Sequence, residues 1–429
     1  MLNYHLLYEK IIYSPLFRAT SVFTIGNILN AGIPFMLMPI MTRYLSPEEY
    51  GITTMFSVLL SIYTPFVGLN LHGFVSVSYF KKNIDFTLLV STCFRMLVVF
   101  VGIVGIVTFL GSNIIGDITA FPSDWLWAVL LLCFCSFFVT VLQTIQQIQG
   151  RSKQYVKVQI AHTATYFALS ILFVVFWGWN WKGRVLAQVI GAFVFFMISF
   201  HYLRSWGLLR WRFSKKYMQA GIRFGLPLLP HALCGFLMVS SDRLFISHML
   251  GLKEVGIFSV GYSLGNAIEL FGEAFNRAFS PWLYRHLQQN DEHGCDSKRM
   301  IVKFSYACMI GFLCFALLYS YFMPWFLSFF LGEKYQLAAQ YIFAFSLSAA
   351  CNAMYYIVVN YIFYCEKTNI LAILTFGNGI AHICITYMMI CEWGAIGAAW
   401  AAVVTQTLSF FGTWWLSNHV YPMPWNLWK

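Results

Sequence analysis

Long apolar stretches dominate the sequence, and they limit the chain to one class of fold. Twelve of them approach or exceed the roughly 20 residues that a helix needs to cross the hydrocarbon core of a bilayer. Within that core every backbone N–H and C=O group needs a partner in the protein, and a helix supplies these partners within one segment. We therefore predict an all-α polytopic membrane protein with 12 transmembrane helices. The predicted spans are Ala19–Thr42, Gly51–Phe80, Met96–Gly116, Trp125–Gly150, Val158–Trp181, Val185–Leu203, Phe224–Ser241, Val255–Phe275, Phe304–Leu331, Tyr341–Tyr364, Asn369–Ile390 and Trp393–Leu416.

The low charge content favours the same class. Hydrophobic residues make up 59% of the 429 positions and charged residues only 10%, whereas soluble domains contain roughly 25% charged residues. A chain of this length with so few charges cannot cover a water-facing surface with them. The surface must therefore face lipid over much of its area.

The positive charge is distributed as a topology signal and not as a nucleic-acid-binding patch. The 27 Lys and Arg residues give a net charge of +11 and occur in short clusters between apolar runs. If the N-terminus is cytoplasmic, 21 of them fall on the cytoplasmic side and 5 on the other, while Arg243 lies within a span. Because cytoplasmic loops are enriched in Lys and Arg, we predict that both termini are cytoplasmic. The first span is expected to direct insertion without a cleaved signal peptide, and no nucleic-acid partner is expected.

Two stretches 205 residues apart resemble each other and indicate an internal repeat. TRYLSPEEYGITTMFS at Thr42–Ser57 aligns with SHMLGLKEVGIFSVGY at Ser247–Tyr262, and the same offset places Arg18 opposite Arg223. Six spans per repeat give both halves the same orientation, an arrangement found in transporters that work by alternating access. We predict two six-helix lobes, residues 1–203 and 220–429, around a central cavity. A basic cytoplasmic linker at residues 204–219 is expected to join them.

The sequence lacks the common motifs of enzymes and metal centres. It contains no Walker A, HExxH or GxSxG pattern, and Cys133 and Cys135 form a C-x-C pair without a His or second Cys pair nearby. No predicted loop outside the membrane is large enough to form a domain, as a glycan-assembling enzyme would usually need. We therefore predict a transporter with no catalytic residues, no metal and no cofactor.

The repeated region also carries a family resemblance. SSDRLFISHMLGLKEVGIFSVGYSLGN at Ser240–Asn266 and IMTRYLSPEEYGITTMFSVLLSIYTPFVGLNL at Ile40–Leu71 resemble bacterial polysaccharide flippases. More narrowly, they resemble Wzx-type O-antigen flippases of the multidrug/oligosaccharidyl-lipid/polysaccharide exporter superfamily. The chain length, the twelve predicted spans and the six-plus-six repeat agree with that family.

The resemblance implies a substrate and a location. Such proteins move an undecaprenyl-diphosphate-linked oligosaccharide, here the O-antigen repeat unit of lipopolysaccharide, from the cytoplasmic to the periplasmic leaflet of the bacterial inner membrane. Membrane lipids and other O-antigen assembly proteins are the implied partners. Two alternatives stay open: a cation-coupled drug or metabolite exporter of the same superfamily, and a membrane glycan polymerase.

Four arginines are candidates for holding the anionic diphosphate, because a guanidinium can bind two phosphate oxygens at once. Arg18 and Arg223 lie at the cytoplasmic ends of the first and seventh predicted spans, where anchoring at lipid phosphates is the competing interpretation. Arg95 is expected one to two turns into the third helix. Arg243 lies toward the periplasmic end of the seventh span.

Three carboxylates are candidates for the cavity or for ion coupling, because ionised groups inside a bilayer usually face a cavity or a partner. Asp242 is expected to orient Arg243 or to bind a cation. Glu269, Glu273 and Arg277 recur at every fourth position, so Glu273 can pair with Arg277 while Glu269 is the candidate for H⁺ or Na⁺. Coupling to the membrane potential is the other expected energy source. Candidates for lining the glycan path, with interhelical packing as the competing interpretation, are Asn27, Asn30 and His231.

Overall fold

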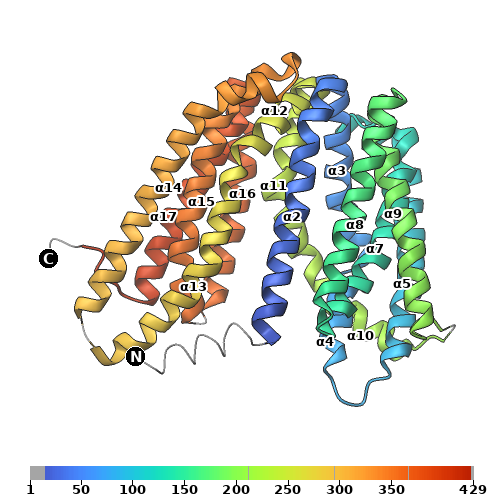
Figure 1. Cartoon of the computed structure of the whole chain (residues 1–429), viewed down its shortest axis with the longest axis horizontal. Coiled ribbons are helices and arrows are strands. Elements are labelled where there is room, and N and C mark those ends of the chain that lie inside the picture. The colour runs from blue at the N-terminus through green and yellow to red at the C-terminus, as the bar shows by residue number, and fades with distance from the viewer. Residues whose placement is uncertain (1–14, 211, 294, 366, 427–429) are drawn as a thin grey trace. The chain divides into compact units, whose positions relative to one another are not determined.

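The protein is built from long helices (Figure 1). The computed structural model describes residues 15–210, 212–293, 295–365 and 367–426, and every regular element within these ranges is helical. Nine of the described helices are long and apolar enough to cross a membrane. The all-α prediction is therefore confirmed, while the count of twelve spans stays a prediction.

The chain divides into two compact units, unit 1 (Met1–Phe236) and unit 2 (Leu237–Lys429). The division falls inside helix α11 (Leu229–Leu250). The predicted lobe boundaries at residues 203 and 220 stay a prediction.

Unit 1 is organised around α7 (Leu126–Ile148), which packs against most of the other long helices of the unit. Figure 1 shows α5, α7, α8 and α9 running side by side. The remaining elements of the unit are α2 (Pro15–Tyr44), α3 (Pro47–Gly68), α4 (Leu71–Tyr79), α5 (Phe86–Leu110), α6 (Ser112–Thr119), η1 (Ser123–Trp125), α8 (Ser152–Ile171), η2 (Leu172–Phe176), α9 (Asn180–Ser205), α10 (Lys215–Gly225) and η3 (Leu226–Leu228).

The start of α3 explains why a glutamate occurs at equivalent positions of the internal repeat. The Ser46 hydroxyl accepts from the backbone N–H of Glu49 at 3.2 Å, and the Glu49 carboxylate accepts from the backbone N–H of Ser46 at 2.8 Å. This capping box satisfies two amides that would otherwise lack a partner. Helix α12 (Leu252–Gly265) begins 205 positions after α3 and carries Glu254, the repeat equivalent of Glu49, in its first turn. The helix macrodipole favours a carboxylate at both places.

Two predicted spans are each divided between two helices. The stretch Gly51–Phe80 contains α3 and α4, separated by Leu69 and Asn70, which have left-handed φ values of 43° and 49°. The stretch Val255–Phe275 contains α12 and the start of α13 (Ala267–His293), with Asn266 between them. The apolar run continues through both breaks, because a helix can end without a change in amino-acid composition. Hydropathy alone therefore predicts one span where the structure has two helices.

The predicted linker is partly helical and packs against unit 1. Helix α10 contacts α4 and α5, and a Cβ atom at Gly221 would lie 3.1 Å from Leu71 and 3.3 Å from Met96. The next membrane helix, α11, begins only at Leu229. Arg223 is an exposed residue of α10, six positions before α11 begins, and its place at the entrance of a span stays a prediction.

Unit 2 is organised around α15 (Ala339–Tyr364), which packs against α12, α13, α14, α16 and α17. The other elements are α14 (Cys295–Phe330), η4 (Glu333–Ala338), α16 (Thr368–Trp393) and α17 (Ala395–Val420). Small buried residues, including Ala349, Ala350, Ala398 and Ala399, occur on α15 and α17. Small side chains let helix backbones approach closely in membranes, where the hydrophobic effect does not drive helix association.

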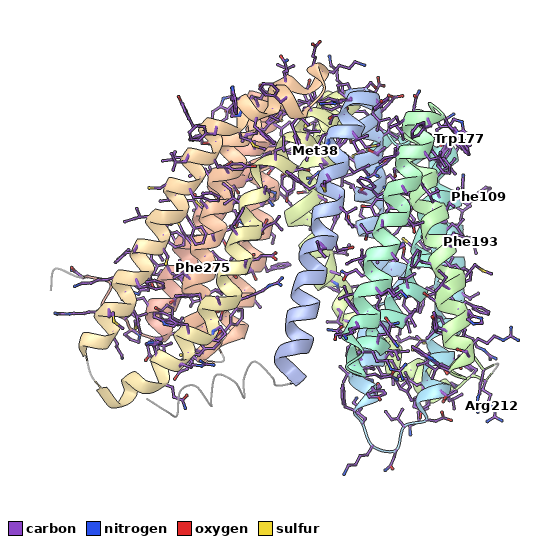
Figure 2. All side chains as sticks on the ribbon, viewed as in Figure 1. Met38, Phe109, Trp177, Phe193, Arg212 and Phe275 are labelled. Carbon is purple, nitrogen blue, oxygen red and sulfur yellow. The ribbon has the colours of Figure 1, made fainter. Side chains whose placement is uncertain are left out.

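Large apolar side chains are exposed on both units. In unit 1, Phe109, Trp177 and Phe193 have 80%, 52% and 47% of their surface exposed, and Figure 2 shows them along one edge of the unit. In unit 2, Trp325 and Trp415 are similarly exposed. This surface fits lipid tails, and the chain is a multi-pass membrane protein.

Candidate functional site

The most deeply buried acidic residue of the described chain is Asp242 on α11, which meets a histidine from α16. Its Oδ1 atom lies 3.0 Å from Nε2 of His382, and the two side chains are only 6% and 5% exposed. Thr386, one turn further along α16, donates to the same carboxylate oxygen at 3.4 Å. A buried charge is costly unless it is paired and hydrogen-bonded, and His382 and Thr386 supply both conditions.

A threonine from α17 completes this group. The other ring nitrogen of His382, Nδ1, lies 3.1 Å from Oγ1 of Thr405. That hydroxyl also bonds to the backbone carbonyls of Ala401 at 2.9 Å and Ala402 at 3.2 Å. We call Asp242, His382, Thr386 and Thr405 the Asp–His cluster; it joins α11, α16 and α17.

Arg243 points toward a different helix from its neighbour Asp242. Its guanidinium carbon lies 4.4 Å from the centre of the Tyr262 ring on α12, and the two side chains are also hydrogen-bonded. Such a cation–π contact stabilises a desolvated guanidinium by up to about 2 kcal/mol. Arg243 is 8% exposed, so α12 holds this charge in a fixed place.

Glu269 receives hydrogen bonds from three donors. Asn266, between α12 and α13, donates to one carboxylate oxygen. Asn352 and Tyr356 on α15 donate to the other at 2.7 Å and 3.5 Å. Asn266 also bonds to the Tyr262 hydroxyl at 3.4 Å, so hydrogen bonds and one cation–π contact connect Glu269 to Arg243. An ionised carboxylate only accepts hydrogen bonds, so three surrounding donors suit the ionised form of Glu269.

Polar contacts continue along the interface of α13 and α15. Asn360 donates to Asn276 at 2.8 Å, and it accepts from Ser280 at 2.8 Å and Tyr284 at 3.1 Å. Interhelical hydrogen bonds of this kind hold membrane helices together. We call the whole set the α13–α15 ladder; its members are Asn266, Glu269, Asn276, Ser280, Tyr284, Asn352, Tyr356 and Asn360.

The other predicted site residues lie apart from these two groups. Glu273 and Arg277 form a largely exposed pair with 3.5 Å between Oε2 and Nη2. In unit 1, Asn30 on α2 accepts from Thr163 on α8, and Arg95 is a half-buried residue of α5. The side chains of Arg18, Asn27 and His231 lie outside the described part of the structure.

Sequence reasoning missed His382, although a signal for it exists. Asn378, His382 and Thr386 recur at every fourth position and form a polar stripe on an otherwise apolar helix. All three are buried, and residues spaced by four lie on one face of a helix. Among the described residues no group of three or more His, Cys, Asp or Glu side chains comes together as a metal site.

Comparison with known proteins identifies the family. The model of the family described as "Polysaccharide biosynthesis protein" matches residues 16–287. The chain belongs to this polysaccharide biosynthesis family. Two relatives of this chain come from Haemophilus influenzae. "Lsg locus putative protein 1" is 26% identical over 371 residues, covering 83% of this chain and 86% of the relative. An "Uncharacterized membrane protein" is 25% identical over 363 residues, covering 82% and 85%.

Solved structures show which fold this family member adopts. An inward closed conformation of the lipid II flippase MurJ superposes with a TM-score of 0.70 at 12% identity, covering 92% of this chain and 87% of that one. An inward-facing multidrug resistance transporter of the MATE family, in the MOP superfamily, has a TM-score of 0.65 at 12% identity, covering 91% and 94%. The chain therefore has the fold of these transporters.

Proposed function

We propose that this protein is a flippase for a lipid-linked oligosaccharide. Its cargo is an undecaprenyl-diphosphate-linked O-antigen repeat unit, which it moves from the cytoplasmic to the periplasmic leaflet of the bacterial inner membrane by alternating access. The observation that carries the proposal is the match to a polysaccharide biosynthesis family in a chain with a flippase fold. A multi-pass membrane protein of such a family is suited to carrying a lipid-linked saccharide across the bilayer.

The cargo explains why charged side chains occur within the membrane domain. Its polyprenyl tail can stay in lipid, whereas its diphosphate and glycan need a polar path. We assign the diphosphate to Arg18, Arg95, Arg223 and Arg243, and the glycan to Asn27, Asn30 and His231. Asp242, Glu269 and Glu273 are the carboxylates assigned to the cavity or to coupling. Outward movement of an anionic head is favoured by a negative cell interior, by about 2.3 kcal/mol per charge at 100 mV.

The test uses cells that lack this protein but keep the glycosyltransferases that build the repeat unit. An impermeant label applied from the periplasm reports whether the lipid-linked glycan has crossed. We expect unlabelled repeat unit to accumulate on the cytoplasmic side and an intact gene to restore labelling. Normal labelling in the deleted strain would refute the flippase function. Unpolymerised glycan in the periplasm would then indicate a polymerase.

A cation-coupled exporter of drugs or metabolites is the second candidate, because the fold is also that of a MATE transporter. The buried Asp–His cluster suits either function, since this exporter is coupled to a cation and a flippase can be coupled to one as well. The deletion strain separates them. An exporter predicts unchanged glycan labelling together with greater sensitivity to the exported compounds.

A further inference from the structure

We propose that the Asp–His cluster is a proton-binding site that fastens α11 to α16 and α17 when its proton is bound. The site lies wholly within unit 2 and its ligand is a single proton. It deepens the proposed function by supplying an energy source, and only the link to transport rests on that function. The proton site itself can be tested without any cargo.

The position of the proton follows from the partners of His382. The Thr405 hydroxyl has one hydrogen, which it donates to the carbonyl of Ala401 or Ala402. While it does so it accepts from His382, and Nδ1 then carries a hydrogen. If Nε2 carried none, its lone pair would face a carboxylate oxygen 3.0 Å away. With Nδ1 protonated, a second proton on His382 removes this repulsion and places a charged imidazolium beside Asp242.

Loss of that proton leaves a buried charge without compensation. In the loaded state His382 is positive and Asp242 is negative; after release of H⁺ to water, His382 is neutral and Asp242 keeps its charge. The other charged or titratable groups of the surroundings are Arg243, Tyr262 and Glu269, which interact with one another beside Asp242. If Glu269 is ionised, the net charge of Asp242, His382, Arg243 and Glu269 together is zero when the proton is bound. It is −1 after the proton has been released. A buried net charge favours any rearrangement that admits water.

Helix α11 is the element that such a rearrangement can move. No other helix backbone packs extensively against α11 in the part of the chain that the structure describes, whereas α16 and α17 pack extensively against each other. Asp242 thus joins α11 to a firmly packed pair of helices. Because a charged His382 attracts Asp242 more strongly than a neutral one does, the attachment is strongest at low pH and weakens as pH rises.

Hydrogen–deuterium exchange of the full chain in lipid nanodiscs tests this directly, with the proton as the probe. After correction for intrinsic exchange, we expect protection of α11 amides to fall with pH, by up to about tenfold per pH unit over the range in which the attached state holds the proton and the detached state does not. We expect Asp242→Asn combined with His382→Gln to remove this pH dependence. His419→Gln, which replaces an exposed histidine of α17, is the matched control and should leave it unchanged.

Protection of wild-type α11 that does not change with pH would overturn the proposal, and this result needs no variant to fold. A pH dependence that persists in the double variant would also overturn it, by assigning the proton to another group. Failure of the flippase function appears instead in the glycan-labelling assay. The two proposals can therefore fail separately.

Discussion

Asp242 and Arg243 are adjacent in sequence, but their side chains serve different helices. Neighbouring residues on a helix project about 100° apart, so Asp242 reaches His382 on α16 while Arg243 covers Tyr262 on α12. The two opposite charges thus have different contact partners. The principal partner of Asp242 is a histidine, and the expectation that Asp242 orients Arg243 or binds a cation stays a prediction.

Glu269 provides a test at the scale of one residue. Glu269→Gln replaces an acceptor oxygen by an amide that donates, so at least one of Asn266, Asn352 and Tyr356 loses its acceptor. Leaving a buried donor without a partner costs about 1–3 kcal/mol. We expect a lower melting temperature in detergent, measured by tryptophan fluorescence.

Glu273→Gln is the matched control for that measurement. The carboxylate of Glu273 is 47% exposed and pairs only with the exposed Arg277, and exposed ion pairs contribute about 0–1 kcal/mol. Its melting temperature should stay close to that of the wild type. Equal losses for the two variants would show that the contacts of Glu269 do not contribute to stability.

At the scale of the helix, packing in unit 2 depends on glycines as much as on large side chains. Gly261 and Gly265, one turn apart on α12, lie against the start of α15. A Cβ atom at Gly265 would stand 2.5 Å from Cβ of Phe345 and 3.0 Å from the carbonyl oxygen of Ile342. Both neighbours are parts of a buried helix that cannot easily shift.

Gly265→Ala should therefore push α12 away from α15. We expect a loss of about 1–3 kcal/mol, the usual cost of overpacking, seen as a lower melting temperature. Gly311→Ala on α14 is the control, because a Cβ atom there would meet nothing within 4 Å. That change should be neutral or slightly stabilising, since Ala favours helices more than Gly does. A neutral Gly265→Ala would contradict the close approach of α12 and α15.

At the scale of the whole molecule, the open question is how many times the chain crosses the membrane. The nine apolar helices follow from length and composition, whereas the prediction of twelve includes α2, α11 and α13, which hold prolines, charges or polar residues. The positive-inside distribution predicts the side on which each loop lies.

Reporter fusions check this topology. A periplasmic phosphatase fused after Pro122, Gly178, Gly251 or Gly394 should be active, and a fluorescent protein that folds only in the cytoplasm should be bright after Lys82, Arg151 or Lys367. Because Gly178 and Gly251 are separated by α9 and α11, activity at both requires α11 to cross. An inactive phosphatase at Gly251 would refute the twelve-span count.

The sequence by itself determined the membrane class, the all-helical fold and, through its resemblance, membership of a polysaccharide biosynthesis family; the narrower Wzx-type resemblance stays a prediction. These properties depend on the summed apolar content of each segment and on local backbone bonding, both of which can be read within about 20 residues. The sequence also predicted that the ionisable residues Asp242, Arg243 and Glu269 lie within or near the membrane-spanning segments. It could not find the breaks at Asn70 and Asn266, because an apolar run continues through a turn.

Only the tertiary structure decided which polar residues meet. Asp242 and His382 are 140 positions apart, and Glu269 and Asn352 are 83 apart, so neither pair leaves a periodic signal within one segment. Hydrogen bonds between helices depend on how each helix is rotated about its axis, and that rotation is set by close packing of small residues such as Gly261 and Gly265. The buried proton site proposed for this protein exists only because α11, α16 and α17 bring their polar faces together.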